Sequence, residues 1–229
     1  MQEQVNYLAP VAEDSLESRS EFIWKCYAHV VGGILAFVAV EVYLFQSGIA
    51  QRIAAPMLGN WLMVLGGFML VGWIASRAAH RAQSTLAQYA AFALFVVAEA
   101  IIFAPLLVLA NYKAPGVIDT AAGITIMGSV ALIATAMITR KDFSFLRGML
   151  VFGGMLVLGF IVVSIVVGYQ PGSWFSLAMI GFAGGAVLYD TSNIMFHYPK
   201  DKYVAAAMQL FASIALMFWY VLMFLMNRE

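Results

Sequence analysis

The stretch GMLVFGGMLVLGFIVVSIVVGYQPGSWFSLAMIGFAGGAVLY, residues 148–189, decides the fold of this chain. It holds 42 residues without a single Asp, Glu, Lys or Arg. A helix needs about 20 mostly apolar residues to cross the hydrocarbon core of a bilayer, so the stretch is long enough for two helices. Glycine and proline in the segment 168–173, GYQPGS, break a helix and redirect the backbone. The pattern predicts two membrane-spanning helices joined by a short turn.

Further apolar segments lie on both sides of this pair. Three of them contain no charged residue and are each long enough for one helix: residues 53–76, 120–139 and 203–227. Two others hold one acid each, which is tolerated where the acid faces protein or water: Glu41 in 22–45 and Glu99 in 87–109. We therefore expect an all-α polytopic membrane protein, a bundle of seven transmembrane helices over residues 22–229.

The composition agrees with this fold class. Hydrophobic residues make up 63% of the 229 residues and charged residues 10%, whereas soluble domains carry roughly 25% charged residues. The formal net charge is +0, which argues against a nucleic-acid partner, because such binding needs a clustered basic face. The single cysteine excludes an internal disulfide framework. The partner that the composition implies is the lipid bilayer.

Lysine and arginine predict the orientation, because cytoplasmic connections hold the excess of these residues. One side of the predicted bundle carries nine of them: Arg19, Lys25, Arg77, Arg81, Arg140, Lys141, Arg147, Lys200 and Lys202. The other side carries three: Arg52, Lys113 and Arg228. We expect a cytoplasmic N-terminus and an external C-terminus. Residues 1–21 are acidic, lack the apolar core of a signal peptide and are expected to form a flexible cytoplasmic tail.

Ionisable residues inside predicted spans are candidates for function, since each is costly to bury. Asp190, Asn193 and His197 recur at i, i+3 and i+7, which places them on one face of a helix as a polar stripe toward the cytoplasm. Arg77 ends another span on the same side. Burial and a nearby cation act in opposite senses on the pKa of a carboxyl group, so Asp190 beside Arg77 is a candidate titrating site. The alternative is a structural ion pair that braces two spans.

The other candidates are weaker. Glu99 has no cation at its depth, so it is either protonated or lines a wet cavity, and Glu41 is expected to be structural. Metalloprotease, serine hydrolase and nucleotide-binding motifs are absent from the sequence. The scattered histidines make a zinc site improbable. We therefore expect a protein without enzymatic activity, metal site or cofactor.

Two stretches resemble the Bax inhibitor (transmembrane Bax inhibitor motif) family, and specifically its bacterial YccA-like branch. One is TRKDFSFL at residues 139–146, and the other is LYDTSNI at 188–194, followed by YVAAA at 203–207. The resemblance covers nearly the whole chain apart from the first residues. It implies a compact bundle in the bacterial inner membrane, with the seventh helix surrounded by the other six.

The resemblance also implies two activities. One is a pH-sensitive calcium leak, in which one acid on the sixth span and one on the seventh exchange a proton and an arginine partner. Asp190 matches the first acid and Arg77 matches the arginine, but Ser213 stands where the second acid is expected. Calcium prefers several hard oxygen ligands, and Asp190, Asn193 and Ser213 offer few, unless Glu99 lies close.

The second activity, implied by the YccA-like branch, is association with the membrane-bound AAA+ metalloprotease FtsH, whose proteolysis the family member restrains. The branch resembles this chain in lacking the second acid. A flexible N-terminal tail offers such a protease a segment to grasp, and a compact bundle resists extraction. We expect modulation of FtsH as the function, with the proton-gated calcium or cation leak as the first alternative. A structural membrane protein braced by Arg77 and Asp190 is the second.

Overall fold

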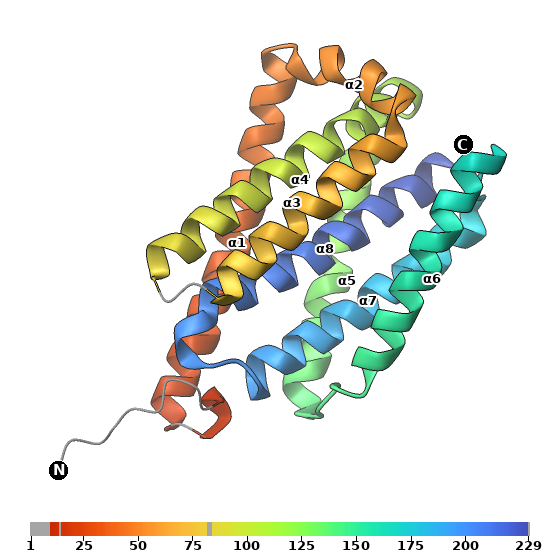
Figure 1. Ribbon diagram of the computed structural model, residues 1–229. Coiled ribbons are helices and arrows are strands. Elements are labelled where there is room, and N and C mark those ends of the chain that lie inside the picture. Colours follow the sequence, from red (N-terminus) through yellow and green to blue (C-terminus); the bar gives the residue numbers. More distant parts are fainter. Residues whose placement is uncertain (1–9, 14, 82–83, 229) are drawn as a thin grey trace.

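The computed structural model describes residues 10–13, 15–81 and 84–228, and its regular elements are helices (Figure 1). Eight α-helices and two short 3₁₀-helices follow one another in this part of the chain: η1 (Val11–Glu13), α1 (Leu16–Gln46), α2 (Ile49–Gly59), α3 (Trp61–Arg81), α4 (Thr85–Lys113), α5 (Val117–Thr139), α6 (Leu146–Val167), α7 (Ser173–Phe196), η2 (Lys200–Lys202) and α8 (Tyr203–Met226).

The fold class agrees with the sequence-based prediction of a polytopic membrane protein. Six of the helical segments are long and apolar enough to cross a membrane: Leu16–Gln46, Leu62–Arg81, Thr85–Lys113, Val117–Thr139, Leu146–Val167 and Lys200–Met226. Helix α7 is 24 residues long but carries Asp190 and Asn193, which lower its hydropathy. The turn predicted at 168–173 is present, with Gly168 in the left-handed region at φ 73°. A count of seven spans remains a prediction.

The predicted span 53–76 has different boundaries in the structure. The segment is divided by Asn60, whose backbone leaves the helical region at φ −124° and ψ 37°. The short helix α2 ends at Gly59, and α3 continues to Arg81. Charge-free sequence alone does not reveal this break, because both sides of it are apolar. The consequence for the site is that Arg77 lies within the last turns of a helix and not beyond its end.

The predicted tail, residues 1–21, is only partly described. Residues 1–9 and 14 lie outside the described residues. Helix α1 begins at Leu16, where the Ser15 side chain accepts a hydrogen bond from the Ser18 N–H group as an N-cap. In η1, Val11 is fully buried, and its N–H group donates to the Tyr198 carbonyl oxygen over 2.9 Å. The segment 10–13 is therefore hydrogen-bonded to the connection between α7 and α8.

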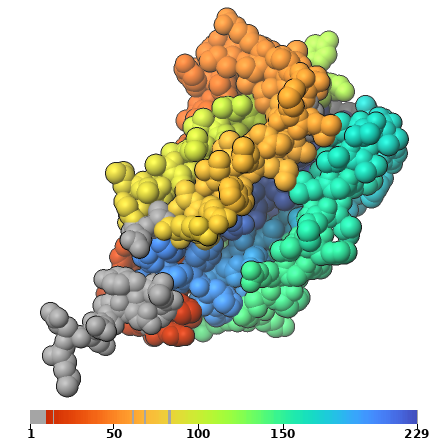
Figure 2. Space-filling model, viewed as in Figure 1, coloured from red at the N-terminus to blue at the C-terminus, as the bar shows by residue number. Residues whose placement is uncertain are grey.

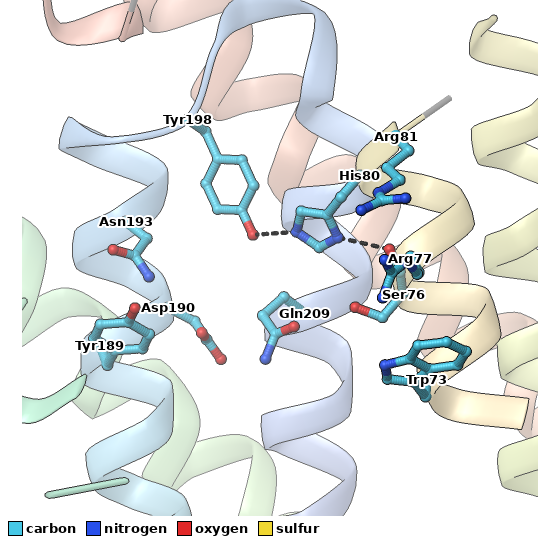
Figure 3. A pocket seen from close by; sticks show the side chains of 10 residues that line it. All are labelled: Trp73, Ser76, Arg77, His80, Arg81, Tyr189, Asp190, Asn193, Tyr198 and Gln209. Carbon is cyan, nitrogen blue, oxygen red and sulfur yellow. Dashed lines mark hydrogen bonds between the residues drawn. The ribbon is translucent and has the colours of Figure 1, made fainter. Parts of the chain in front are cut away.

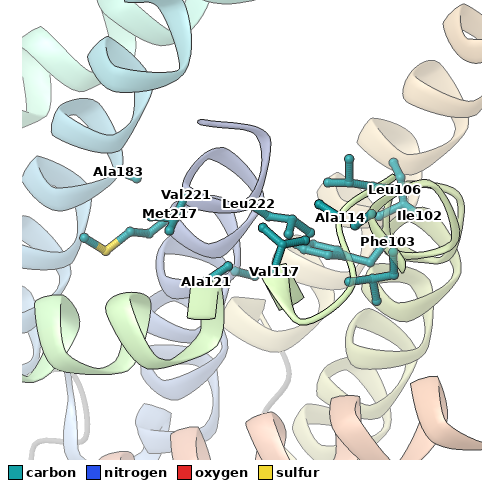
Figure 4. Packing of buried hydrophobic residues seen from close by; sticks show 13 residues of the cluster. Ile102, Phe103, Leu106, Ala114, Val117, Ala121, Ala183, Met217, Val221 and Leu222 are labelled. Carbon is teal, nitrogen blue, oxygen red and sulfur yellow. The ribbon is translucent and has the colours of Figure 1, made fainter. Parts of the chain in front are cut away.

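Helix α8 supplies most of the core. It packs against α1, α3, α4, α5 and α7, while α6 packs mainly on α7 (Figure 1). Ala205, Ala206 and Ala207 are fully buried in its first turns, and such small residues let helices approach closely. Toward the other end, Met217, Val221 and Leu222 interlock with residues of α4 and α5 (Figure 4). A last helix enclosed by all six others remains an expectation.

Candidate functional site: a polar cavity at the basic end of the bundle

A cavity of about 480 Å³ opens between α3, α7 and α8. Ten residues line it (Figure 3): Trp73, Ser76, Arg77, His80, Arg81, Tyr189, Asp190, Asn193, Tyr198 and Gln209. The cavity lies at the end of the bundle where α3 and α7 finish and α8 starts, which we call the basic end because it carries Arg77, Arg81, Lys200 and Lys202. Helix α7 stops at Phe196, shortly before Pro199, because the residue preceding a proline disfavours helical backbone.

Asp190, in the wall of this cavity, contacts Ser213 behind it. The Ser213 hydroxyl on α8 donates a hydrogen bond of 2.5 Å to the Oδ2 atom of Asp190 on α7. Asp190 is only 2% exposed, and its Oδ1 atom has no hydrogen-bond partner within the described residues. The serine that stands where the resemblance predicts a second acid is therefore the direct partner of the first acid.

Arg77 lines the same cavity but is not paired with Asp190. Within residues 10–13, 15–81 and 84–228, no ion pair joins the two side chains. The Arg77 guanidinium instead lies 4.9 Å from the centroid of the Trp73 ring, a cation–π contact. In Figure 3, Gln209 of α8 lies between Asp190 and the side chains of α3. The predicted Arg77–Asp190 brace is therefore absent, because each group has a nearer partner on its own side of the cavity.

The predicted polar stripe on α7 divides at its end. Asn193 lines the cavity with Asp190, one turn closer to the basic end. His197 turns away, and its Nε2 atom lies 3.4 Å from the Oδ2 atom of Asp142. Glu99 is buried in α4 and is not part of the cavity lining, so the structure does not bring it to Asp190.

His80 and Tyr198 form a contact that sequence reasoning missed. The His80 Nδ1–H group donates to the Ser76 carbonyl oxygen over 2.8 Å, and the Nε2 atom of the ring lies 3.2 Å from the Tyr198 hydroxyl oxygen, within hydrogen-bond distance (Figure 3). Burial raises the pKa of the Tyr198 phenol, and the nearby Asp190 carboxyl adds to the effect, so the hydroxyl keeps its proton. The two residues are 118 positions apart in the sequence, and no local sequence pattern predicts their contact.

Comparison with known proteins places this bundle in a family. A family model described as inhibitor of apoptosis-promoting Bax1 matches residues 19–229. The chain belongs to the Bax inhibitor family. It is also similar to an uncharacterised protein of Pseudomonas aeruginosa, with 34% identity over 101 residues. That match covers 43% of this chain and 44% of the relative, so the chain spans less than half of that protein.

The two stretches that carry the resemblance to the Bax inhibitor family lie in contact. Asp142, from TRKDFSFL, accepts hydrogen bonds at Oδ1 from the Ser144 N–H group over 2.9 Å and from the Ser192 hydroxyl over 3.2 Å. Ser192, from LYDTSNI, in turn accepts from the Phe143 N–H group over 2.9 Å. The α5–α6 connection is thus held against the end of α7.

The same contacts lower the pKa of Asp142. Burial alone raises the pKa of a carboxyl group, but here the hydrogen bonds from Ser144, the Coulombic interaction with His197 and the Ser192 hydroxyl together outweigh it. The pKa of Asp142 is therefore lowered, and the group is a stable anion at neutral pH. The only sequence signal for this contact is the Asp-x-Ser spacing, which is typical of an Asx-turn.

Proposed function

We propose that this Bax inhibitor family protein is a proton-sensitive leak for cations, calcium among them, with Asp190 as its gate. The observation that carries the proposal is the state of the Asp190 carboxyl group: it is buried beside a polar cavity, has one hydroxyl donor and has no paired cation among the described residues. Buried charges are normally paired or saturated with hydrogen bonds. A group held so sparsely responds to the gain or loss of one proton.

In this proposal, the arrangement described above is the closed form of the leak. On the side of Asp190 away from the basic end, Val187 of α7 and Ile214 of α8 belong to one buried apolar cluster. An ion that reached Asp190 through the cavity would have to pass this apolar layer, and a charge in an apolar layer is costly. Opening therefore requires that α7 and α8 separate near the Asp190–Ser213 hydrogen bond.

The small number of oxygen ligands at the cavity favours slow passage of calcium over tight binding. Calcium takes six to eight oxygen ligands, whereas Asp190, Asn193 and Ser213 contribute few. Arg77 and Arg81 line the same cavity and repel cations. We infer that the basic end faces the cytoplasm of a bacterial cell, as its excess of lysine and arginine favours, so the cavity would be the cytoplasmic mouth.

The test is calcium flux into dye-loaded proteoliposomes at several pH values. Wild-type protein should show flux that changes with pH, and Asp190→Asn should lose that pH dependence. Ser176→Ala is the matched control, because Ser176 is buried on the same helix but its hydroxyl has no partner within the described part of the chain. Equal flux and pH dependence in wild-type protein and Asp190→Asn would refute the gate.

Modulation of the protease FtsH is the second candidate, supported by the resemblance to the YccA-like branch and by the single carboxylate. Because Ser213 stands in place of a second acid, Asp190 has no second carboxyl group at this position to which its titration could couple. If wild-type protein shows no flux and Ser213→Asp does, the wild-type chain does not conduct ions, and modulation of the protease becomes the leading function. Cells expressing a variant without residues 2–20 should then retain it longer than wild-type protein, and equal half-lives would contradict the partnership.

A further inference from the structure

Helix α8 is covered on every side but one. Helices α1, α4, α5 and α7 enclose most of its surface, and α3 packs against α4 and α8. A stripe of partly buried residues remains at helical spacing: Gln209, Ala212, Leu216, Trp219 and Met223. Figure 2 shows the hollow, where blue atoms of α8 are visible between the orange and yellow α3 and the green to teal α6. We call this hollow the lateral groove.

Beyond Gln209 the stripe in the lateral groove is apolar, and its length matches one leaflet of the bilayer. From Gln209 to Trp219 the stripe rises about 15 Å, at 1.5 Å per residue, which is half of the roughly 30 Å hydrocarbon core. On its α3 side, Met69 and Leu70 are 45% and 57% exposed. A groove of this length and polarity fits an acyl chain.

At its basic end the lateral groove meets the cavity. The side of the cavity opposite the Asp190 carboxyl group carries cationic side chains. Arg77, His80 and Arg81 come from the last turns of α3, are exposed, and lie at the cavity wall opposite Asp190 (Figure 3). Within the described residues neither arginine is paired with a carboxylate. Guanidinium groups suit phosphate, because they donate several hydrogen bonds in a fixed planar arrangement. Trp73, one turn further into the bundle, is 58% exposed, as is typical of tryptophan at the headgroup level.

We propose that the lateral groove binds one glycerophospholipid, with its phosphate on Arg77 and Arg81 and one acyl chain along the α8 stripe. The charge complementarity selects a phosphate, and the apolar groove that continues from it selects a lipid over a free anion. The occupant lies over α8 in the lateral groove, and it is held by residues other than Asp190 and Ser213.

The test measures lipid retention by native mass spectrometry of the full chain in a neutral detergent, titrated with dioleoyl phosphatidylglycerol. The groove variant is Arg77→Gln with Arg81→Gln. The matched control is Arg140→Gln with Arg147→Gln, which removes the same charge from exposed residues that do not line the cavity. We expect one tightly retained lipid in wild-type protein and in the control, and a Kd at least tenfold weaker in the groove variant.

Two further ligands separate the headgroup from the chain. Dioleoylglycerol lacks the phosphate and should bind at least tenfold more weakly than the phospholipid, while inorganic phosphate lacks the chains and should not displace it. Ala212→Phe, which fills the floor of the lateral groove, should weaken phospholipid binding while Arg77 and Arg81 stay in place. The proposal is overturned if both double variants lose the lipid equally, if dioleoylglycerol binds as well as the phospholipid, or if phosphate competes. None of these outcomes depends on calcium flux, so the result is independent of the leak.

Discussion

Replacement of Ser213 by alanine tests the central contact of the site. The Ser213 hydroxyl is buried and is the donor that Asp190 has in the described part of the chain, since Oδ1 is already without a partner. Removing it leaves both carboxyl oxygens unsatisfied. A buried acceptor that loses its donor costs about 1–3 kcal/mol, and a charged one more. For a chain of this size each kcal/mol lowers Tm by about 2–4 °C, so Ser213→Ala should lower Tm by about 2–12 °C.

The assay is thermal unfolding in detergent, followed by tryptophan fluorescence. Ser176→Ala removes a similarly buried hydroxyl that has no partner among residues 10–13, 15–81 and 84–228, so it should leave Tm nearly unchanged. In an Asp190→Asn background the charge is gone, and the loss caused by Ser213→Ala should shrink, which a double-mutant cycle measures as coupling. The reasoning fails if Ser213→Ala behaves like Ser176→Ala, or if its effect is the same in both backgrounds.

Three further predictions concern the rest of the bundle. The pKa of Asp142 is lower in the folded chain than its unfolded value of about 3.9, so its contacts stabilise the fold above that value, and this stabilisation is lost as pH falls through the folded pKa. Asp142→Asn should therefore lower Tm at neutral pH, and the difference in Tm from wild-type protein should shrink in acid. A difference in Tm that persists unchanged at pH 3 would contradict the assignment. Val11→Asp places a charge in a fully buried position, so limited proteolysis near residue 11 should become faster, whereas the partly exposed Ala12→Asp should not change it. Phe211→Ala removes a ring that contacts three phenylalanine rings of α1 and α4 and should cost about 3–5 kcal/mol, measured as a fall in Tm, while Phe145→Ala on the surface should cost little.

The sequence predicted the elements of this fold better than their ends. Long apolar stretches require apolar surroundings, and this requirement does not depend on neighbouring helices. The sequence therefore predicted seven spans and the turn at 168–173; the turn is present, and six helical segments of the described residues are long and apolar enough to cross a membrane. The break at Asn60 was missed because it lies between two apolar segments and changes backbone direction without changing hydropathy. Hydropathy along the chain indicates whether a helix lies in lipid or in water, but it does not report the local geometry of the backbone.

The site was predicted in part for a similar reason. Helical spacing places Asp190 and Asn193 on one face, and both line the cavity. The pairing of Asp190 with Ser213 came from the resemblance, which marks two positions on different helices as neighbours. Spacing along one helix cannot show which residue of another helix lies opposite, so Arg77 was expected at Asp190 and the contact between His80 and Tyr198 was not foreseen.

The position of α8 in the chain bears on how the protein assembles. This helix supplies the surface on which α1, α3, α4, α5 and α7 pack, yet the ribosome makes it after all of them. Until it is inserted, those helices meet lipid or one another where α8 will later lie, and the Asp190 carboxyl group lacks the hydroxyl that partners it. A chain interrupted before residue 203 would therefore leave the faces of those helices that α8 covers, and the Asp190 carboxyl group, without their partners in the bilayer.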